Sequence, residues 1–370
     1  MNSPDSLQRE PIMVTRATLP PLEEYIGYLE QIWSSHLLTN NGPLVRKLED
    51  QLRDYLGSPH LWFVNNCTTA LQITIKALGL QGEIITTPFS YVATTGVILW
   101  ENCIPVFVDI RPGDLTIDPE QIEAAITPRT CAILATHVYG FPCDVAAIEA
   151  IARRHGLKVI YDAAHAFGCR LDGRPLAAYG DVSCFSFHAT KAFHTTEGGA
   201  IVVNGDPGLA ERVRLMRAFG HQGDDHRFLG VNGKNSEFHA AMGLCNLPRF
   251  ATNLALRRIQ HDGYSRLLAG SPLRLPRPQA KDLSYNYAYF PVLLPDELAV
   301  LRSLSSLAQL DIHPRRYFYP SLNRVPYVNG RDCPISEQAS KTVLCLPMSE
   351  QVTSVLQETI IDTLLRENRL

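Results

Sequence analysis

The sequence predicts an α/β protein with a mainly parallel, seven-stranded sheet flanked by helices in a large domain, followed by a smaller α+β domain. Short apolar runs rich in β-branched residues recur between residues 61 and 203. Amphipathic stretches separate several of these runs, and such alternation is typical of a parallel sheet covered on both faces. Beyond residue 272 a proline-rich, irregular stretch leads into a mixed segment. The expected strands are Leu61–Val64, Glu83–Thr87, Ile104–Asp109, Cys131–Thr136, Leu157–Tyr161, Val182–Phe187 and Ala200–Val203.

Two helices are expected before the first strand. Apolar residues recur at helical spacing over residues 22–33, directly after a pair of prolines. A turn follows at Thr39–Pro43, and Pro43 then begins a second helix that runs to about Tyr55. Further helices are expected over residues 68–77, 91–100, 119–125, 145–154, 207–219 and 298–310, from about residue 236, and at the C-terminus.

We expect these elements to form two domains. The large domain comprises residues 1–255 and includes an N-terminal arm. The small domain comprises residues 256–370. The basic pair Arg257–Arg258 marks the expected hinge between them.

Composition and charge exclude several classes of protein. With 370 residues, of which 45% are hydrophobic and 19% charged, the chain matches a soluble enzyme with a substantial core. A formal charge of −3 gives no global field that would attract nucleic acid or an anionic membrane. No apolar run approaches the roughly 20 residues that cross a bilayer. The 9 cysteines are scattered without metal-ligand spacing, so we expect reduced thiols, a cytoplasmic location and no bound metal.

Asp162 and Lys191 carry the chemical prediction. Asp162 follows the expected strand Leu157–Tyr161, at the sheet edge where ligands of α/β proteins bind. A buried carboxylate there can keep the pyridine nitrogen of pyridoxal phosphate protonated, and a lysine amine can form a Schiff base with its aldehyde. Alone, Asp162 could cap a helix and Lys191 could be a solvated surface lysine. Together, and followed by Glu197–Gly199, they predict a pyridoxal phosphate site.

Several sequence blocks resemble the sugar aminotransferases of the DegT/DnrJ/EryC1/StrS group. The most specific are Tyr161–Gly168, Phe185–Lys191 and Glu197–Gly199, and Gly230–Lys234 and Ala240–Gly243 add to them. They occur in the right order over most of the chain. The resemblance implies the fold of type I pyridoxal-phosphate enzymes, an aminotransferase activity, and pyridoxal 5′-phosphate as the cofactor, alternating with pyridoxamine phosphate.

The resemblance also implies roles for individual residues. Lys191 falls on the lysine that binds the cofactor covalently, and Asp162 on the partner of the pyridine nitrogen. Ser186 falls on a hydroxyl that binds the phosphate. Cys67 and Thr68 lie in the segment that holds the same phosphate at the start of a helix, where free amides favour an anion. Cys67 departs from the glycine or alanine that many members carry, and Thr68 alone would read as a helix cap.

Three further residues are assigned to the cofactor by the same resemblance. Tyr91 matches the aromatic residue that stacks on the pyridine ring, although alone it would read as a core aromatic. His165 lies where a side chain contacts the phenolic oxygen, and a buried structural histidine is the alternative. Asn232 matches the asparagine that reaches the phosphate from the neighbouring subunit. The resemblance therefore implies a homodimer with shared active sites.

Four residues are expected to face the substrate. His188 lies beside the expected sugar site and could assist proton transfer. Arg315, Arg316 and Tyr317 resemble the substrate-facing turn of the family. An arginine pair suits a carboxylate or a pyrophosphate, whereas without the resemblance the pair would read as a solvated surface patch.

The segments Val14–Glu24, Thr86–Thr94 and Phe187–Lys191 look most similar to family members that make dTDP-4-amino-4,6-dideoxyglucose. This similarity implies ping-pong transfer of an amino group from L-glutamate to C4 of dTDP-4-keto-6-deoxy-D-glucose. The product would supply surface polysaccharides such as the O-antigen of lipopolysaccharide.

Three alternatives remain open at this point. Amination at C3 of a dTDP-3-keto-6-deoxyhexose uses the same chemistry, and the residues alone do not fix which carbonyl faces the cofactor. A sugar dehydratase on the same cofactor would carry histidine in place of Lys191. A non-catalytic sensor is disfavoured by the intact Asp162, Ser186 and Lys191.

Overall fold

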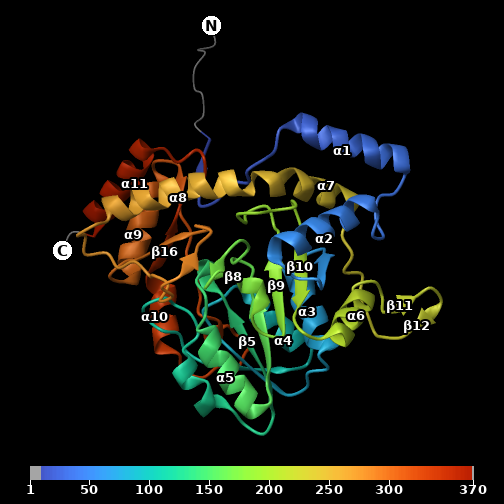
Figure 1. The fold of residues 1–370 in the computed structure, drawn as a ribbon. Coiled ribbons are helices and arrows are strands. Elements are labelled where there is room, and N and C mark those ends of the chain that lie inside the picture. The colour runs from blue at the N-terminus through green and yellow to red at the C-terminus, as the bar shows by residue number, and fades with distance from the viewer. Residues whose placement is uncertain (1–9, 369–370) are drawn as a thin grey trace.

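The computed structural model describes residues 10–368 and places helices on both faces of a central sheet (Figure 1). One strand runs antiparallel to both of its neighbours, and the other neighbouring strands are parallel, so the mainly parallel sheet is confirmed. In spatial order the 7 strands are β2 (Leu61–Val64), the antiparallel β10 (Gly199–Val203), β9 (Val182–Ser186), β6 (Lys158–Asp162), β5 (Thr130–Thr136), β3 (Glu83–Thr86) and β4 (Ile104–Phe107).

Most expected helices are present, with one exception. Residues 119–125 form two short 3-10 turns, Pro119–Gln121 and Glu123–Ala125, in place of a helix. Pro128 disfavours a helical conformation at Thr127, so too few residues remain to nucleate an α-helix. The helices are α1 (Leu22–Ser35), α2 (Pro43–Leu56), α3 (Cys67–Ala77), α4 (Val92–Trp100), α5 (Val145–His155), α6 (Pro207–Met216), α7 (Glu237–Asn246), α8 (Phe250–Leu267), α9 (Glu297–Ala308), α10 (Pro334–Thr342) and α11 (Ser354–Glu367).

Successive side chains along each strand point to opposite faces of the sheet, and the core is therefore divided between the two faces. On β10, Ala200 and Val202 pack into a cluster with Leu48 of α2. The intervening residue Ile201 packs into a second cluster with Ile73 of α3. Side chains that alternate in this way bury both faces, which explains why the strands read as continuous apolar runs.

A second core lies in the C-terminal part of the chain. Helices α8, α9 and α11 contribute apolar side chains to it, together with the strand pair β14 (Phe290–Leu293) and β16 (Val343–Leu346). The residues of the predicted hinge, Arg257–Arg258, lie inside the continuous helix α8, and Arg257 is buried, donating a hydrogen bond to the carbonyl of Ala288 at 3.4 Å. The division between residues 255 and 256 falls within α8, and the two domains stay a proposal.

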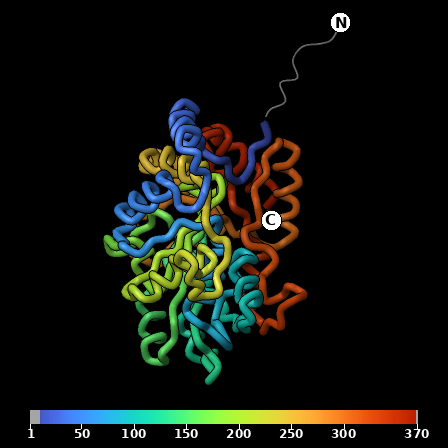
Figure 2. Tube along the Cα trace, turned by 90° about the vertical axis from the view of Figure 1, so that its right-hand side faces the viewer, coloured from blue at the N-terminus to red at the C-terminus, as the bar shows by residue number. Residues whose placement is uncertain are grey.

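The N-terminal strand β1 (Ile12–Met13) pairs in parallel with β15 (Ile312–His313). Figure 2 accordingly shows the start of the described chain beside the orange and red C-terminal segments. The arm that was expected to belong with the large domain therefore adds its strand to the C-terminal part of the structure.

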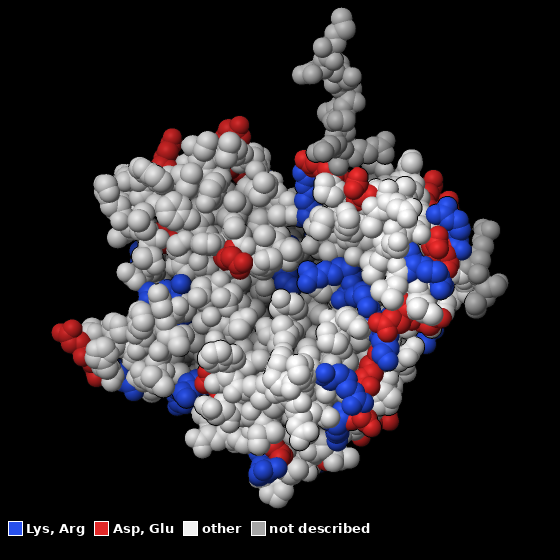
Figure 3. All heavy atoms as spheres, turned by 180° about the vertical axis from the view of Figure 1, so that it is seen from behind, with Lys and Arg blue, Asp and Glu red and all other residues white. Residues whose placement is uncertain are grey.

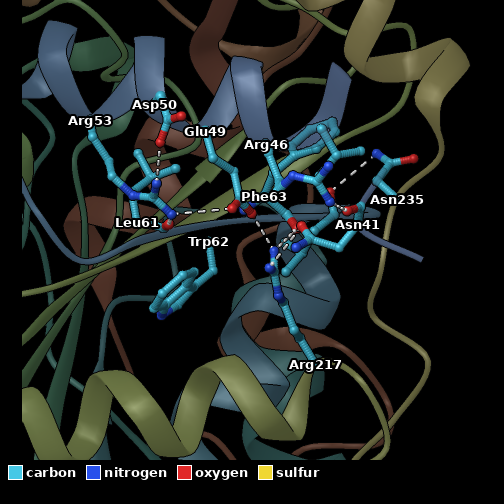
Figure 4. Close-up of polar contacts among 12 residues, drawn as sticks. Asn41, Arg46, Glu49, Asp50, Arg53, Leu61, Trp62, Phe63, Arg217 and Asn235 are labelled. Atoms are coloured by element: carbon cyan, nitrogen blue, oxygen red, sulfur yellow. Dashed lines mark hydrogen bonds and ion pairs between the residues drawn. The ribbon is translucent and has the colours of Figure 1, made fainter. Parts of the chain in front are cut away.

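A buried ion pair joins α2 to the end of α6. Glu49 and Arg217 are 2% and 6% exposed and face each other in Figure 4. Glu49 accepts a hydrogen bond from the Phe63 amide at 2.9 Å, and Arg217 donates to the Phe63 carbonyl at 2.8 Å. The pair thereby connects both helices to β2, an edge strand of the sheet.

The charged surface is mixed on the face that Figure 3 presents. Lysine and arginine side chains lie there in small groups, with acidic side chains nearby, and most of that face is uncharged. Among residues 10–368, no helix is both long and apolar enough to cross a membrane.

Candidate active site

A cavity of about 260 Å³ lies at the carboxyl ends of β5, β6 and β9. The start of α3, the residues that begin α4, and the turn Arg315–Phe318 complete its wall. Parallel strands bring their carboxyl ends to one edge of the sheet, which explains how distant segments meet there. The predicted residues that line the cavity are Cys67, Thr68, Tyr91, Asp162, His165, Ser186, His188, Lys191, Arg315 and Tyr317.

Asp162 and Lys191 face the same cavity. Asp162 is the last residue of β6 and is 4% exposed. Burial raises the pKa of the Asp162 carboxyl, and a hydrogen bond from the Thr94 hydroxyl opposes that rise. Burial lowers the pKa of the Lys191 amine, which increases the share of the neutral amine that can act as a nucleophile.

His165 is oriented as a hydrogen-bond donor toward the cavity. Its Nδ1 accepts a hydrogen bond from the Tyr139 amide at 3.0 Å. Burial holds the pKa of His165 well below its usual value, so the ring is neutral and its single proton lies on Nε2. The rings of Tyr289 and Phe318 pack against the imidazole at centroid distances of 4.5 and 5.6 Å and fix its plane.

The start of α3 offers backbone amides to an anion. Asn66 caps the helix by accepting from the Thr69 amide at 2.8 Å, and the amides of Cys67 and Thr68 precede the first intrahelical bond. Gly199 is required for this arrangement, because a Cβ there would lie 2.7 Å from the Asn66 carbonyl carbon. The start of β10 can therefore approach the helix cap closely.

The Cys67 side chain at the start of α3 is directed toward β9. Its thiol lies 3.6 Å from the carbonyl oxygen of Cys184 on β9, and it packs against the apolar cluster beneath α3. Burial raises the pKa of the Cys67 thiol well above its usual value, so the group is neutral.

Two predicted residues lie away from the cavity of their own chain. Asn232 is exposed, and its side chain accepts from the Lys234 amine at 2.7 Å. Arg316 pairs with Glu297 at 2.6 Å and lies over the ring of Tyr319. The prediction that both arginines face the substrate is therefore not matched by their placement. Arg315 lines the cavity, whereas the Arg316 guanidinium is directed to Glu297 of α9.

The sequence did not identify several residues that complete the site. Thr94 donates to Asp162 at 2.6 Å, and the hydroxyl of Tyr289 lies 3.4 Å from the Lys191 amine. Ser90 and Thr136 also line the cavity. Thr94 lies 68 residues before Asp162, and Tyr289 belongs to a run that reads as core, so no local pattern marks either residue.

Residues 22–365 match the DegT/DnrJ/EryC1/StrS aminotransferase family. The chain belongs to this family. A dTDP-4-amino-4,6-dideoxy-D-glucose transaminase of Shigella dysenteriae is 44% identical over 364 residues, which cover 96% of this chain and 98% of the relative. A transaminase of the same name from Escherichia coli is 40% identical over 351 residues, covering 91% and 93%. The structure of DesI in the presence of its TDP-sugar product has a TM-score of 0.91 and 33% identity, covering 97% of this chain and 94% of DesI.

As a DegT/DnrJ/EryC1/StrS aminotransferase, the protein depends on pyridoxal phosphate and has the predicted type I fold. The cavity fits that cofactor. It presents a carboxylate for the pyridine nitrogen at Asp162, an N–H donor at His165, an amine at Lys191, and free amides at the start of α3. Among residues 10–368, no group of three or more His, Cys, Asp or Glu side chains could hold a metal ion.

Proposed function

We propose that this aminotransferase transfers the amino group of L-glutamate to C4 of dTDP-4-keto-6-deoxy-D-glucose, giving dTDP-4-amino-4,6-dideoxy-D-glucose. The observation that carries the proposal is similarity over nearly the full length to two transaminases named for that product, at 44% and 40% identity. The cavity supports it, because it places an amine, a carboxylate and a cationic side chain, Arg315, around one space.

Each residue of the cavity has a distinct task in this proposal. Pyridoxal phosphate, when bound, supplies the electron sink that transamination requires. Lys191 binds the cofactor aldehyde, and its released amine then moves a proton to and from the substrate carbon. Asp162 keeps the pyridine nitrogen protonated, and His165 donates a hydrogen bond to the phenolic oxygen. The α3 amides, with Ser186, hold the phosphate.

Incubation with glutamate and either a 4-keto or a 3-keto dTDP-sugar tests the substrate. We expect an amine at C4 of the 4-keto sugar and no amination of the 3-keto sugar, as judged by NMR of the product. Amination at C3 alone would support the alternative substrate, a dTDP-3-keto-6-deoxyhexose. If neither sugar is aminated, the substrate proposal is wrong, although the cofactor site could remain correct.

Arg315 and Arg316 allow a matched test of the substrate-facing turn. Arg315 lines the cavity, its guanidinium lies over Tyr317, and it forms no ion pair with any of residues 10–368. We expect Arg315→Ala to raise KM for glutamate or the nucleotide sugar by about 10- to 100-fold, the effect of losing a hydrogen bond to a charged group. Arg316→Ala should leave both KM values unchanged and lower Tm, because Arg316 pairs with Glu297. The reverse pattern would assign the substrate contact to Arg316.

We also propose a homodimer in which Asn232 of each chain reaches the phosphate site of the partner. The loop before Asn232 exposes apolar side chains, and so does a groove of about 630 Å³ beside the cavity. Covering both surfaces in a dimer would remove this apolar area from water. The exposed side chains are Phe228, Leu229 and Val231 of the loop and Val92, Trp100 and Tyr327 of the groove. Sedimentation as a monomer at assay concentration would contradict the dimer.

We further infer that the enzyme works in the cytoplasm and supplies an amino sugar for surface polysaccharide such as O-antigen. All 9 cysteines are free thiols, and most are buried, which suits a reducing compartment. The proposed product keeps its nucleotide, a leaving group that a glycosyltransferase can displace. Loss of the amino sugar from surface polysaccharide in a strain lacking the enzyme is the expected result.

A further inference from the structure

Asp162 is held by a hydrogen bond on each of its carboxylate oxygens. Oδ1 accepts from the Ala164 amide at 3.0 Å, and Oδ2 accepts from the Thr94 hydroxyl at 2.6 Å. Thr94 is fully buried in the first turn of α4. The carboxylate is therefore fixed from two directions, and its remaining acceptor capacity is left for the cavity that it lines.

The Thr94 hydroxyl ends a chain of three buried hydroxyls. Thr94 and Ser90 lie 2.7 Å apart, and Ser90 and Thr136 lie 3.0 Å apart, measured between their hydroxyl oxygens. An ionised carboxylate can only accept, so the single Thr94 proton is used on Asp162. Ser90 must then donate to Thr94, and Thr136 must donate to Ser90. The chain thus has one direction, from Thr136 toward Asp162.

This direction favours the charged form of Asp162. Burial raises the pKa of that carboxyl, and among the contributions that lower it the Thr94 hydrogen bond is the largest. Hydroxyls donating in series polarise one another, which strengthens the last bond of the series. The other titratable groups that act on Asp162 are Lys191 beyond β9, Cys67 of α3 and Cys184 of β9.

We propose that Thr94, supported by Ser90 and Thr136, is the positioning residue that keeps Asp162 ionised and aimed at the pyridine nitrogen of the cofactor. The inference rests on the assignment of Asp162 to that nitrogen. Thr94 acts through Asp162 and does not line the cavity itself, so its effect should appear in cofactor binding and its pH dependence as well as in turnover.

The test follows cofactor retention by the holoenzyme as the pH is lowered, from its visible absorbance after dialysis. Without the Thr94 hydrogen bond, the pKa of Asp162 rises, and protonation removes the charge that pairs with the pyridine nitrogen at a higher pH. In Thr94→Val the acid limb of cofactor retention should therefore move upward by about 1 to 2 pH units, as expected for a lost hydrogen bond to a charged group. Thr94→Ser keeps the hydroxyl and should restore the wild-type limb.

Thr95→Val is the matched control. Thr95 is the next residue of α4 and is also fully buried, but its hydroxyl has no hydrogen-bond partner among the described residues. Its acid limb should coincide with that of the wild type. An unshifted limb in Thr94→Val, or an equal shift in Thr95→Val, would overturn the inference.

A second variant covers the possibility that Thr94→Val does not fold. Ser90→Ala removes the donor to Thr94. It should move the acid limb of cofactor retention upward in pH by a smaller amount than Thr94→Val does. An unshifted limb in Ser90→Ala would again overturn the inference. If the wild-type protein itself retains no cofactor, the proposed function fails instead, so the two failures can be distinguished.

Discussion

Replacing Lys191 by alanine is expected to reduce amino transfer by at least about 10⁴-fold in kcat, because one amine both binds the cofactor and moves the proton. Burial lowers the pKa of the Lys191 amine, and another lysine would share this shift only if it reached the same cavity. Steady-state kinetics with saturating cofactor measure the loss. Borohydride should fix the cofactor to the wild-type chain and add its mass to the intact protein, and Lys191→Ala should show no added mass.

Lys76→Ala provides the control for this experiment. Lys76 lies on α3, is about half exposed, and faces Glu101 at 3.8 Å, away from the cavity lining. Its removal should change neither turnover nor the added mass. Cofactor that borohydride still attaches to Lys191→Ala would show that a different amine binds it, and the assignment of Lys191 would be wrong.

Glu49→Ala is expected to lower the free energy of unfolding by about 3–5 kcal/mol, because it leaves the buried Arg217 guanidinium without its carboxylate partner. The Phe63 amide also loses its acceptor in this variant. Urea unfolding at equal protein concentration, followed by far-UV circular dichroism, gives the midpoint and slope that measure the change.

Asp50→Ala separates the buried pair from an ordinary surface pair. Asp50 is the next residue of α2, but its side chain is 71% exposed and pairs with Arg53 at 2.7 Å. Exposed pairs of this kind contribute about 0–1 kcal/mol, so the unfolding midpoint should barely move. Equal losses in both variants would mean that the Glu49–Arg217 pair adds nothing beyond surface electrostatics.

The strands were predictable because their signal is local. Both faces of the sheet are buried, so each strand is a short apolar run, and the observed bounds differ from the expected ones by at most two residues. The helix predicted at residues 119–125 is absent for a local reason as well. The apolar spacing there suits a helix, but Pro128 leaves too few residues to form one. A basic pair usually lies at the surface, whereas α8 buries Arg257, which donates a hydrogen bond to the Ala288 carbonyl.

The sequence by itself determined the parts of the site that lie in short contiguous motifs. These are Asp162 at the end of β6, Lys191 after β9, and the start of α3 after β2. Only the tertiary structure decided which side chains support them. The Thr94 hydroxyl meets Asp162, and the Tyr289 hydroxyl meets Lys191, through contacts between segments 68 and 98 residues apart. The turn that contains Arg315 and Arg316 is placed against β16 by tertiary contacts. Only in that placement does Arg315 line the cavity while Arg316 lies outside it. Sequence periodicity reports which face of an element is buried, but the partner it meets is fixed by how the elements pack.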